Sequence, residues 1–473
     1  MTAIVLRDYQ SLTLADTRTA FANGARAVLL VAPTGSGKTV MFSCVASGAM
    51  ARGGRVLILT HRQELIRQTS QTLSAFDVPH GLIAPGHPPT ADAVQVASVQ
   101  TIVRRLAGLD WRPTLIVVDE SHHATRTTGH GRVLTHFAEA RVLGVTATPQ
   151  RLDGQGLGRA AGGFFDALVL GPTVAALVDA GYLSRPVVYA PPGAPDLSDL
   201  RTIGGDFARD ELAEAMDRPV ITGSAVTHYA RLCPGQPAIA FCASVAHAEH
   251  VAGAFRAAGY QAASIDGTLD DATRARRIAD LGTGALQVLT SCEIISEGTD
   301  IPIVAAALLL RPTQSLGLYL QQVGRALRPF PGKGHATILD HVGNCHRHGL
   351  PDDDRVWTLE GRKRRKTDPA PDLAIKQCPV CYTVHRPARA CPSCGFVYPV
   401  QPRVLEQVDG ELAQVQRAAE REAAREAAKQ AQRDAKTLED LRRLGAARGY
   451  RPGWAERVHA ARQGSQAPRR ASR

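Results

Sequence analysis

Short apolar runs alternate with segments of helical character over most of the chain. In the first 170 residues each apolar run is followed by polar residues. These runs occupy 27–31, 55–60, 94–98, 115–118 and 142–145. Strands that alternate with helices form parallel sheets, whose ligands bind beyond the carboxyl ends of the strands. The pattern therefore predicts an α/β domain over residues 1–170.

The alternation is interrupted once. Residues 171–220 lack a comparable strand pattern and include the proline-rich stretch 191–195, so they predict a connector with a helix over 210–216. From residue 221 the strand pattern returns and continues to 350. Its predicted strands are 238–242, one ending at 264–268, and 287–291. A second α/β domain is expected over residues 221–350.

Three further segments follow. Residues 351–376 predict a linker with the basic run 362–366, for which solvation is the default interpretation and phosphate contact the alternative. Residues 377–400 hold four cysteines. Residues 401–473 predict a helical, basic, partly disordered tail with a small docking element near Trp454. Within it, residues 404–447 are rich in Ala, Glu, Arg and Gln and predict a long solvated helix, with a coiled coil as the alternative.

Composition narrows the class of protein. The chain has 473 residues, too many for one core, and 55 basic against 44 acidic residues leave a net charge of +11. Such a charge favours a polyanionic partner, although part of it could belong to a solvated tail. No apolar stretch is long enough to cross a membrane and no signal peptide is apparent, so we expect a cytoplasmic protein without a membrane partner.

The strand at 27–31 is followed by a glycine-rich loop and a helix, the arrangement of a P-loop. Gly35 and Gly37 would turn backbone N–H groups toward phosphate, Lys38 would bridge the β- and γ-phosphates of ATP, and the Thr39 hydroxyl would bind Mg²⁺. A chance glycine turn before a helix is the alternative. The predicted nucleotide contacts here are Pro33, Thr34, Gly35, Ser36, Gly37, Lys38 and Thr39.

Two carboxylates follow the strand at 115–118. In the Walker B arrangement Asp119 would hold Mg²⁺ through water, and Glu120 would orient and deprotonate the attacking water. A helix N-cap is the alternative interpretation. Upstream, Gln10 has a donor and an acceptor that could pair with adenine, or it could be an ordinary surface glutamine.

The second α/β domain has no P-loop of its own, so we expect it to contribute other residues to the nucleotide site. Arg325 and Arg328 lie three residues apart and would share one face of a helix, from which they could reach the γ-phosphate across a cleft. An arginine pair on a solvated helix is the alternative. The histidine-rich segment 341–348 fits no metal-ligand spacing, so we expect a loop beside the nucleic-acid path.

Four of the nine cysteines form two CxxC pairs, and the others are scattered. Four thiolates in two turns suit tetrahedral Zn²⁺, which would stabilise a segment too small for its own core. An iron centre is the alternative, and disulfides are disfavoured in a reducing compartment. The predicted zinc ligands are Cys378, Cys381, Cys391 and Cys394.

In this order, the motifs of residues 1–350 resemble those of superfamily 2 helicases and translocases of the DExH kind, nearest the branch of DNA-repair helicases and restriction-enzyme motors. The resemblance implies an α/β fold of two tandem RecA-like domains with ATP between them and a nucleic-acid strand crossing both. It assigns adenine recognition to the segment with Arg7 and Gln10, and a coupling motif to 146–148. It implies further nucleotide contacts at Gly298, Asp300 and Gln321, with Arg325 and Arg328 as arginine fingers. It implies nucleic-acid contacts at Arg62, Ser98, Gln100, Thr101 and Thr299.

The leading hypothesis is therefore an ATP-dependent helicase or translocase, with DNA favoured by the resemblance alone. One alternative is an RNA helicase of the same fold. Another is a non-motor clamp that ATP closes on nucleic acid while the zinc module recruits a partner. A protein partner could bind through the zinc module or the tail.

Overall fold

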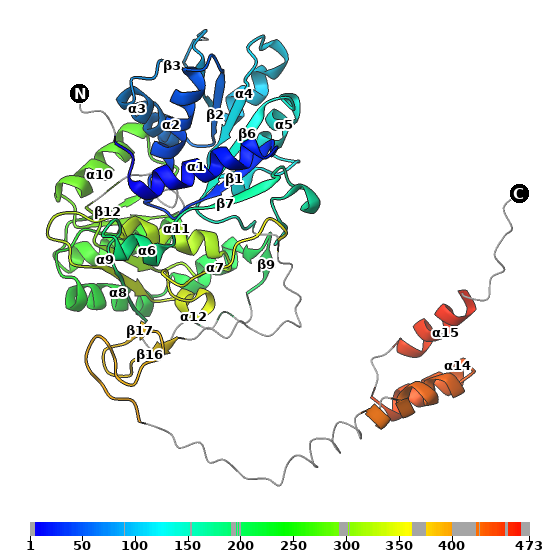
Figure 1. Cartoon of the computed structure of the whole chain (residues 1–473). Helices are drawn as coiled ribbons and strands as arrows, with labels where there is room; N and C mark the ends of the chain where they lie inside the picture. Colours follow the sequence, from blue (N-terminus) through cyan, green and yellow to red (C-terminus); the bar gives the residue numbers. More distant parts are fainter. Residues whose placement is uncertain are drawn as a thin grey trace, which may run out of the picture. The chain divides into compact units, whose positions relative to one another are not determined.

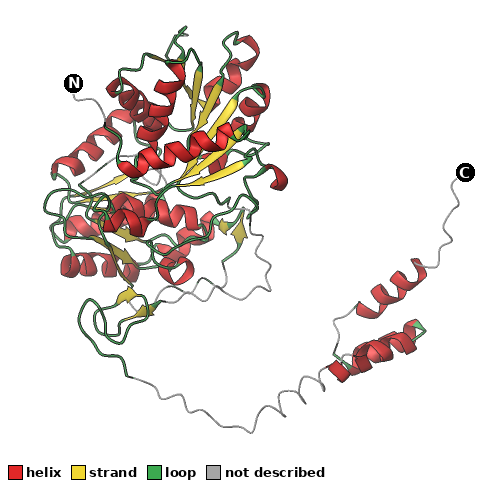
Figure 2. Ribbon diagram, in the orientation of Figure 1, coloured by secondary structure: helices red, strands yellow, loops and turns green. Residues whose placement is uncertain are grey.

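The computed structural model describes residues 5–464, except for 89, 152–153, 191–194, 196, 198–199, 293–300, 302, 362–374, 400–421, 425 and 450–452. The chain divides into two compact units, Met1–Tyr398 and Pro399–Arg473, which we describe separately. The first unit contains two sheets flanked by helices (Figures 1 and 2). We call the part around the first sheet, up to residue 170, the first lobe, and the part around the second sheet the second lobe.

The first lobe is a seven-stranded parallel sheet of order β3-β4-β2-β5-β6-β1-β7. Successive residues of a strand enter cores on opposite faces, as Leu29 and Leu30 do. Covered on both faces, the central strands are continuous apolar runs that could be recognised in the sequence. The strands are β1 (Ala27–Val31), β2 (Val56–Thr60), β3 (His80–Ile83), β4 (Val94–Ser98), β5 (Leu115–Val118), β6 (Arg141–Thr146) and β7 (Ala167–Leu170).

The helices of the first lobe flank this sheet (Figure 2). They are α1 (Asp8–Ala22), α2 (Lys38–Met50), α3 (Gln63–Ala75), α4 (Val99–Arg105) and α5 (Gly129–His136), with short 3₁₀ turns at Leu106–Gly108, Ser121–His123 and Arg159–Ala161. None of the helices among the described residues is long and apolar enough to cross a membrane.

The second sheet has eight strands in the order β12-β13-β11-β14-β15-β8-β17-β16. It is parallel from β12 to β8, and its last two strands pair antiparallel. The strands are β8 (Pro186–Tyr189), β11 (Ala238–Phe241), β12 (Ala262–Ile265), β13 (Val288–Ser291), β14 (Ala306–Leu309), β15 (Ala336–Asp340), β16 (Lys376–Gln377) and β17 (Thr383–His385). A separate two-stranded ribbon joins β9 (Thr202–Ile203) to β10 (Asp206–Phe207). The helices are α6 (Val174–Asp179), α7 (Arg209–Met216), α8 (Pro219–Leu232), α9 (Val245–Ala257), α10 (Asp271–Thr283), α11 (Leu316–Ala326) and α12 (Asn344–His348).

The connector predicted over 171–220 is wrong in one respect, because β8 lies inside the second sheet between β15 and β17. Its apolar pair Val187 and Val188 is too short for a recognisable run, and pairing with two neighbours makes it a strand. Leu212 and Met216 of α7 also enter the second-lobe core. The helix predicted over 210–216 is present as α7.

The segment predicted as a linker over 351–376 is ordered in its described first part. Arg355 donates to the carbonyl oxygens of Leu350 and Asp353, both at 2.8 Å. Trp357 and Leu359 then pack against the core of the first lobe. Trp357 and Leu359 could not be recognised as core residues in the sequence, because charged residues surround them and their packing partners lie in the other lobe. The basic run 362–366 lies outside the described residues.

The cysteine-containing segment continues the second sheet instead of forming a detached module. β17 pairs with β8, and Arg386 contacts Asp352 at 3.2 Å and Asp353 at 3.0 Å. The segment is therefore part of the second lobe.

The described part of the second unit contains a hairpin of α14 (Leu438–Ala447) and α15 (Trp454–Gly464). Leu441 and Ala455 are buried in its core, and Leu438, Leu444, Trp454 and Val458 pack around them. The leucines predicted to lead into a docking element thus pack on the helix that follows. Of the long helix predicted over 404–447, residues 422–424 and 426–434 are helical, and residues 404–421 lie outside the described part. The helix is not continuous to Ala447, because Thr437 caps the start of a separate helix, α14.

Candidate active site

The loop between β1 and α2 has the backbone that the glycines require. Gly35 and Gly37 have φ angles of 87° and 79°, and Gly37 is the N-cap of α2. A Cβ at Gly37 would lie 2.5 Å from Gln10 Nε2, and one at Gly35 would lie 2.9 Å from Leu183 Cδ2. Both positions therefore need glycine for conformation and for space. The loop with the N-terminus of α2 has the form of a phosphate cradle.

Residues of α1 hold this loop from one side. Gln10 Nε2 and Tyr9 Oη both donate to the Ser36 carbonyl, at 3.0 and 2.8 Å. The Arg7 backbone N–H donates to Gln10 Oε1 at 3.0 Å. Gln10 is buried, so it is not the surface glutamine of the alternative interpretation. It fixes the shape of the loop, and its contact with adenine stays a prediction.

An aromatic residue that sequence reasoning missed lies beside this corner. Tyr182 packs edge-on against Tyr9, with ring centroids 5.2 Å apart, and the Arg7 guanidinium lies 4.6 Å from the Tyr182 centroid. The two tyrosines are far apart in the chain, so no local pattern joins them.

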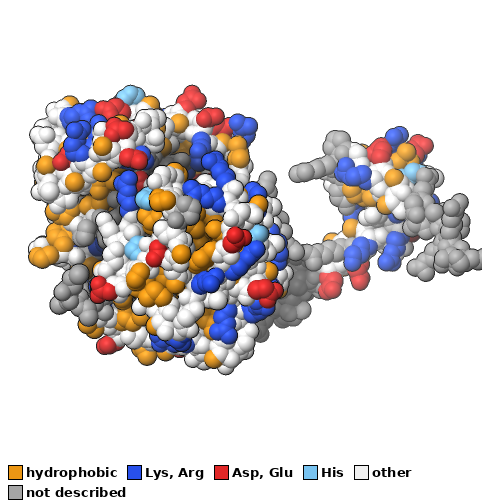
Figure 3. Space-filling view, turned by 90° about the horizontal axis from the view of Figure 1, so that it is seen from above, with side chains coloured by type: hydrophobic (Ala, Val, Ile, Leu, Met, Phe, Trp, Pro, Cys, Tyr) orange, Lys and Arg blue, Asp and Glu red, His pale blue; other side chains and the backbone are white. Residues whose placement is uncertain are grey.

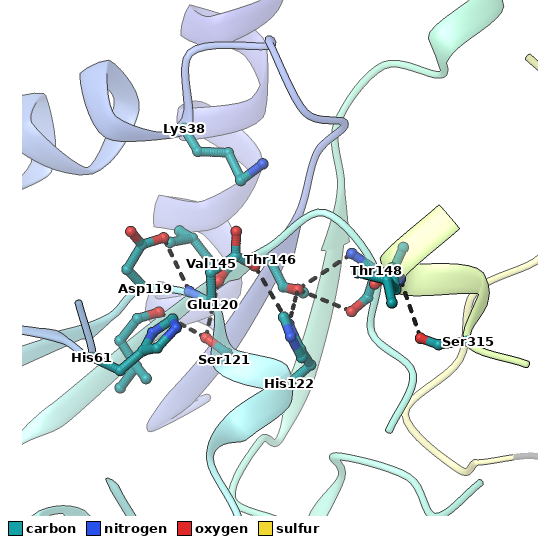
Figure 4. A network of polar contacts seen from close by, with 12 residues as sticks. Lys38, His61, Asp119, Glu120, Ser121, His122, Val145, Thr146, Thr148 and Ser315 are labelled. Carbon is teal, nitrogen blue, oxygen red and sulfur yellow. Dashed lines mark hydrogen bonds and ion pairs between the residues drawn. The ribbon is translucent and has the colours of Figure 1, made fainter. Parts of the chain in front are cut away.

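The carboxylates after β5 face the loop (Figure 4). Asp119 is buried and its Oδ1 accepts from the Glu120 backbone N–H at 3.0 Å. Burial and the neighbouring Glu120 raise the pKa of Asp119 to about 7, while Lys38 opposes the shift. Burial likewise lowers the pKa of Lys38, opposed by both carboxylates. The two neighbouring carboxylates are hard oxygen donors of the kind that fits Mg²⁺.

A chain of polar contacts leads from Glu120 toward the second lobe (Figure 4). Glu120 Oε2 lies 3.4 Å from His122 Nδ1, which lies 3.1 Å from Thr146 Oγ1. Thr146 Oγ1 donates to the Thr148 carbonyl at 2.9 Å. Thr148 in turn lies against α11, since a Cβ at Gly317 would be 2.8 Å from Thr148 Oγ1. The segment 146–148 thus connects Glu120 with α11, the helix that bears Arg325. Arg328 lies beyond the end of α11, so the prediction that both arginines share one face of a helix is wrong.

The second lobe places α11 directly on the loop. Gly324 of α11 lies so close to Thr34 of the loop that a Cβ at Gly324 would be only 2.6 Å from the Thr34 Cβ. Arg325, in the last turn of α11, is buried, as is Gln321. Arg325 and Arg328 are close enough to Lys38 for their charges to lower its pKa further. Both arginines therefore lie near Lys38 and its loop, which the alternative of a solvated helix does not predict.

Lys333 is a second residue that sequence reasoning missed. Its Nζ donates to the carbonyls of Arg328 at 2.7 Å and Val304 at 2.8 Å, and also to that of Ala326. It holds the end of α11 and the residues just beyond it. Burial and the charge of Arg328 lower the pKa of Lys333 to about 7. In the sequence, the only local signal for Lys333 is its position directly after Pro331 and Gly332.

The predicted nucleic-acid contacts of the first lobe share the carboxyl edge of two neighbouring strands, β2 and β4. Arg62 is the N-cap of α3, and Ser98 is the N-cap of α4. Ser98 Oγ donates to Gln100 Oε1 at 2.8 Å, and Thr101 is buried in α4. Gly298, Thr299 and Asp300 lie outside the described residues.

The two lobes also meet through ion pairs between α3 and α10. Arg274 lies 3.7 Å from Glu64, and Arg67 lies 4.0 Å from Asp271. In this arrangement the lobes are apposed on both the nucleotide side and the α3 side.

The histidine-rich segment 341–348 is not a loop, which corrects our expectation. His341 follows β15 and is buried, with its ring 5.0 Å from that of His228. His348 stacks on Tyr319 at 5.5 Å. Burial lowers the pKa of His341 to about 3 and that of His348 to about 4. Neutral imidazoles can enter a core, so a run of histidines does not by itself mark a surface.

The four predicted zinc ligands lie together, with all their Sγ atoms within 4.8 Å of one another. Cys378 and Cys394 have their Sγ atoms 3.6 Å apart, as have Cys381 and Cys391. Tetrahedral Zn–S bonds of about 2.3 Å would put sulfurs about 3.8 Å apart, so the spacing fits zinc. Among the described residues, no other group of three or more His, Cys, Asp or Glu is placed to hold a metal ion.

Family models match three parts of the chain. Residues 3–151 match the type III restriction enzyme res subunit, and 225–329 match the helicase conserved C-terminal domain. Residues 360–404, which include the cysteines, match the ribosomal L32p protein family.

Relatives extend across both lobes. A Lactococcus phage protein described only by its size, 51.5 kDa, is 32% identical over 393 residues, which are 82% of each chain. The protein named ATP-dependent helicase IRC3 in Saccharomyces cerevisiae is 30% identical over 362 residues, or 72% of this chain and 52% of that protein. The type I restriction enzyme EcoKI endonuclease subunit of Escherichia coli is 26% identical, over 72% of this chain and 35% of its own. The chain thus spans about half the length of the yeast relative.

Solved structures share the fold. A fragment of an HsdR subunit of a type I restriction enzyme from Vibrio vulnificus superposes with a TM-score of 0.59 at 20% identity, covering 74% of this chain and 67% of that one. The type ISP restriction-modification enzyme LlaBIII, solved bound to DNA, gives a TM-score of 0.50 at 16% identity, over 72% of this chain and 28% of its own.

Proposed function

This chain belongs to the superfamily 2 helicases and translocases, and we propose that it is an ATP-driven motor that moves along DNA. One observation carries the proposal: α11 of the second lobe packs on the Lys38 loop at Thr34, so that its buried Arg325 lies near enough to Lys38 for the two charges to interact. A cleft made by two lobes can couple nucleotide hydrolysis to their relative movement.

We assign the roles within the cleft as follows. Backbone N–H groups of the loop and Lys38 would bind the phosphates, and Thr39 with Asp119 would hold Mg²⁺. The bound Mg²⁺ would neutralise charge that develops on the phosphates. Glu120 orients water and accepts its proton. Arg325 and Arg328 stabilise negative charge from the other lobe, so that hydrolysis is fastest when the lobes are closed.

Backbone contacts would explain how such a motor holds DNA of any sequence. Arg62, Ser98 and Gln100 lie at one sheet edge, where they can contact phosphates. On the face shown in Figure 3, Lys and Arg side chains gather in several groups. The relatives named as restriction enzymes favour DNA over RNA as the polymer.

The test is ATP hydrolysis measured with no polymer, single-stranded DNA, duplex DNA and RNA. We expect stimulation by DNA. Equal rates in all four samples would reject the motor, and stimulation by RNA alone would favour the RNA helicase. A displacement assay on DNA then separates a motor from a clamp, because a clamp would bind without moving.

Replacing Gln10 with alanine is expected to raise KM for ATP roughly tenfold, because the Ser36 carbonyl loses a buried donor. The turnover number should change little. If Gln10 also reads adenine, KM for ATP should rise more than KM for GTP; equal rises would confine Gln10 to holding the loop. Gln71→Ala, at an exposed position of α3, is the matched control and should change neither constant.

We further propose that the four cysteines bind one structural Zn²⁺. Replacing Cys394 with serine should remove zinc from the purified chain and unfold the segment around β16 and β17, since structural zinc can supply roughly 10 to 16 kcal/mol of folding energy. Metal analysis and limited proteolysis after residue 376 measure both effects. Cys44→Ser, at a cysteine outside the cluster, should keep the metal. Iron with its visible absorbance in the wild-type chain would contradict the zinc assignment.

A further inference from the structure

We propose that the helical hairpin of the second unit is a second binding site for the nucleic-acid backbone, in addition to the motor lobes. The hairpin consists of α14 and α15. The inference rests on the proposal that the chain acts on nucleic acid. It adds a second contact with nucleic acid, made by residues outside the helicase motifs.

The charge of the chain is concentrated in this region. Residues 436–473 contain ten Lys and Arg against three Asp and Glu, a net charge of +7 out of +11 for the whole chain. The remaining 435 residues therefore carry only +4. The excess expected of a polyanion-binding protein thus belongs mostly to the hairpin and the residues that follow it.

The few carboxylates of the hairpin are engaged within it. Glu439 pairs with Arg443 at 3.0 Å, and Glu456 pairs with Arg442 at 2.9 Å. Asp440 accepts from the hydroxyl and the backbone N–H of Thr437 in a capping box. These carboxylates are therefore already used to hold the hairpin together.

Basic side chains remain on its surface. Lys436 precedes α14, Arg448 follows it, and Arg457 lies in the second turn of α15. All three are exposed. Lysine and arginine at such positions can contact phosphates without reading a base.

The apolar side chains of the hairpin do not offer a competing surface. Leu441 and Ala455 are buried, and no large apolar side chain is strongly exposed among the described residues of this unit. A protein partner usually requires an exposed apolar patch or aromatic anchors. The surface of the hairpin therefore fits a polyanion better than an apolar protein groove.

The test uses the full chain with the triple change Lys436→Glu, Arg448→Glu and Arg457→Glu. Binding to duplex DNA is measured by fluorescence anisotropy over a range of salt concentrations. Each lost phosphate contact should make the slope of log K against log salt shallower by about 0.9, and three such contacts should weaken binding at least about tenfold near 0.1 M salt. At saturating DNA the turnover number should be unchanged.

A matched control reverses three exposed arginines of the first lobe, Arg18, Arg52 and Arg55, which lie on α1, after α2 and at the amino end of β2. It changes the net charge by the same amount. We expect a smaller loss of affinity and an unchanged slope. Glutamine at the three hairpin positions removes charge without reversing it and should give an intermediate affinity, which guards against a folding defect.

The outcomes separate the two proposals. A triple variant with wild-type affinity and slope overturns the hairpin site, as does a control that loses as much as the hairpin variant. Failure of the wild-type chain to bind DNA at any salt concentration would instead overturn the proposed function.

Discussion

Replacing Arg325 with alanine is expected to lower the turnover number about 10³- to 10⁵-fold, the effect of losing an arginine finger. That factor corresponds to roughly 4 to 7 kcal/mol of barrier. Arg325 is buried at the end of α11, which packs on the phosphate loop of the other lobe. Its charge would act on the transition state more than on bound ATP, so the dissociation constant for ATP should change much less than the rate.

Single-turnover hydrolysis and binding of a fluorescent ATP analogue measure these two quantities. Arg231→Ala is the matched control, because Arg231 occupies the last turn of another helix of the same lobe, α8, and is exposed. It should hydrolyse ATP at the wild-type rate. An Arg325 variant within tenfold of the wild-type rate would show that the second lobe does not complete the site.

Glu120→Gln should lower turnover about 10²- to 10⁴-fold, the usual loss for a general base, while ATP still binds. The amide keeps the shape of the side chain and cannot accept the proton from water. Because Lys38 and Asp119 are unchanged, the variant should hold ATP and DNA together for longer than the wild-type chain does.

Hydrolysis and DNA retention in the presence of ATP are the measurements. Glu139→Gln, at a position whose side chain is 98% exposed, is the control and should change neither. Full activity of the Glu120 variant would reject its assignment as the base. Loss of ATP binding would also reject it, and would place Glu120 among the Mg²⁺ or phosphate contacts.

The first-lobe motifs could be predicted because each depends on a short stretch of chain. A strand, two glycines and a helix start suffice to form a phosphate cradle, and five strands of this lobe could be located from their apolar runs. The runs were visible because helices cover both faces of the sheet, as the separate cores on either side of β1 show. The outer strands β3 and β7 form no continuous apolar run, since only two of the four residues of β3 and one of the four of β7 are buried.

The second lobe was harder to predict, because several of its elements depend on distant partners. β8 and β17 are short and become strands by pairing with each other, although nearly 200 residues separate them in sequence. Trp357 gains its partners from the first lobe. The histidine-rich sequence predicts a loop at His341, yet the neutral ring of His341 fits a buried position beside His228.

By itself, the sequence determined the resemblance to superfamily 2 helicases, the order of the two α/β domains, and the candidate residues for phosphate and metal, because these depend on local spacing. Only the tertiary structure decided that α11 with Arg325 packs on the Lys38 loop, that Tyr182 packs on Tyr9, and that Lys333 holds the end of α11. These contacts join parts of the chain through the packing of whole elements, and the apposition of two lobes leaves no local periodicity in the sequence.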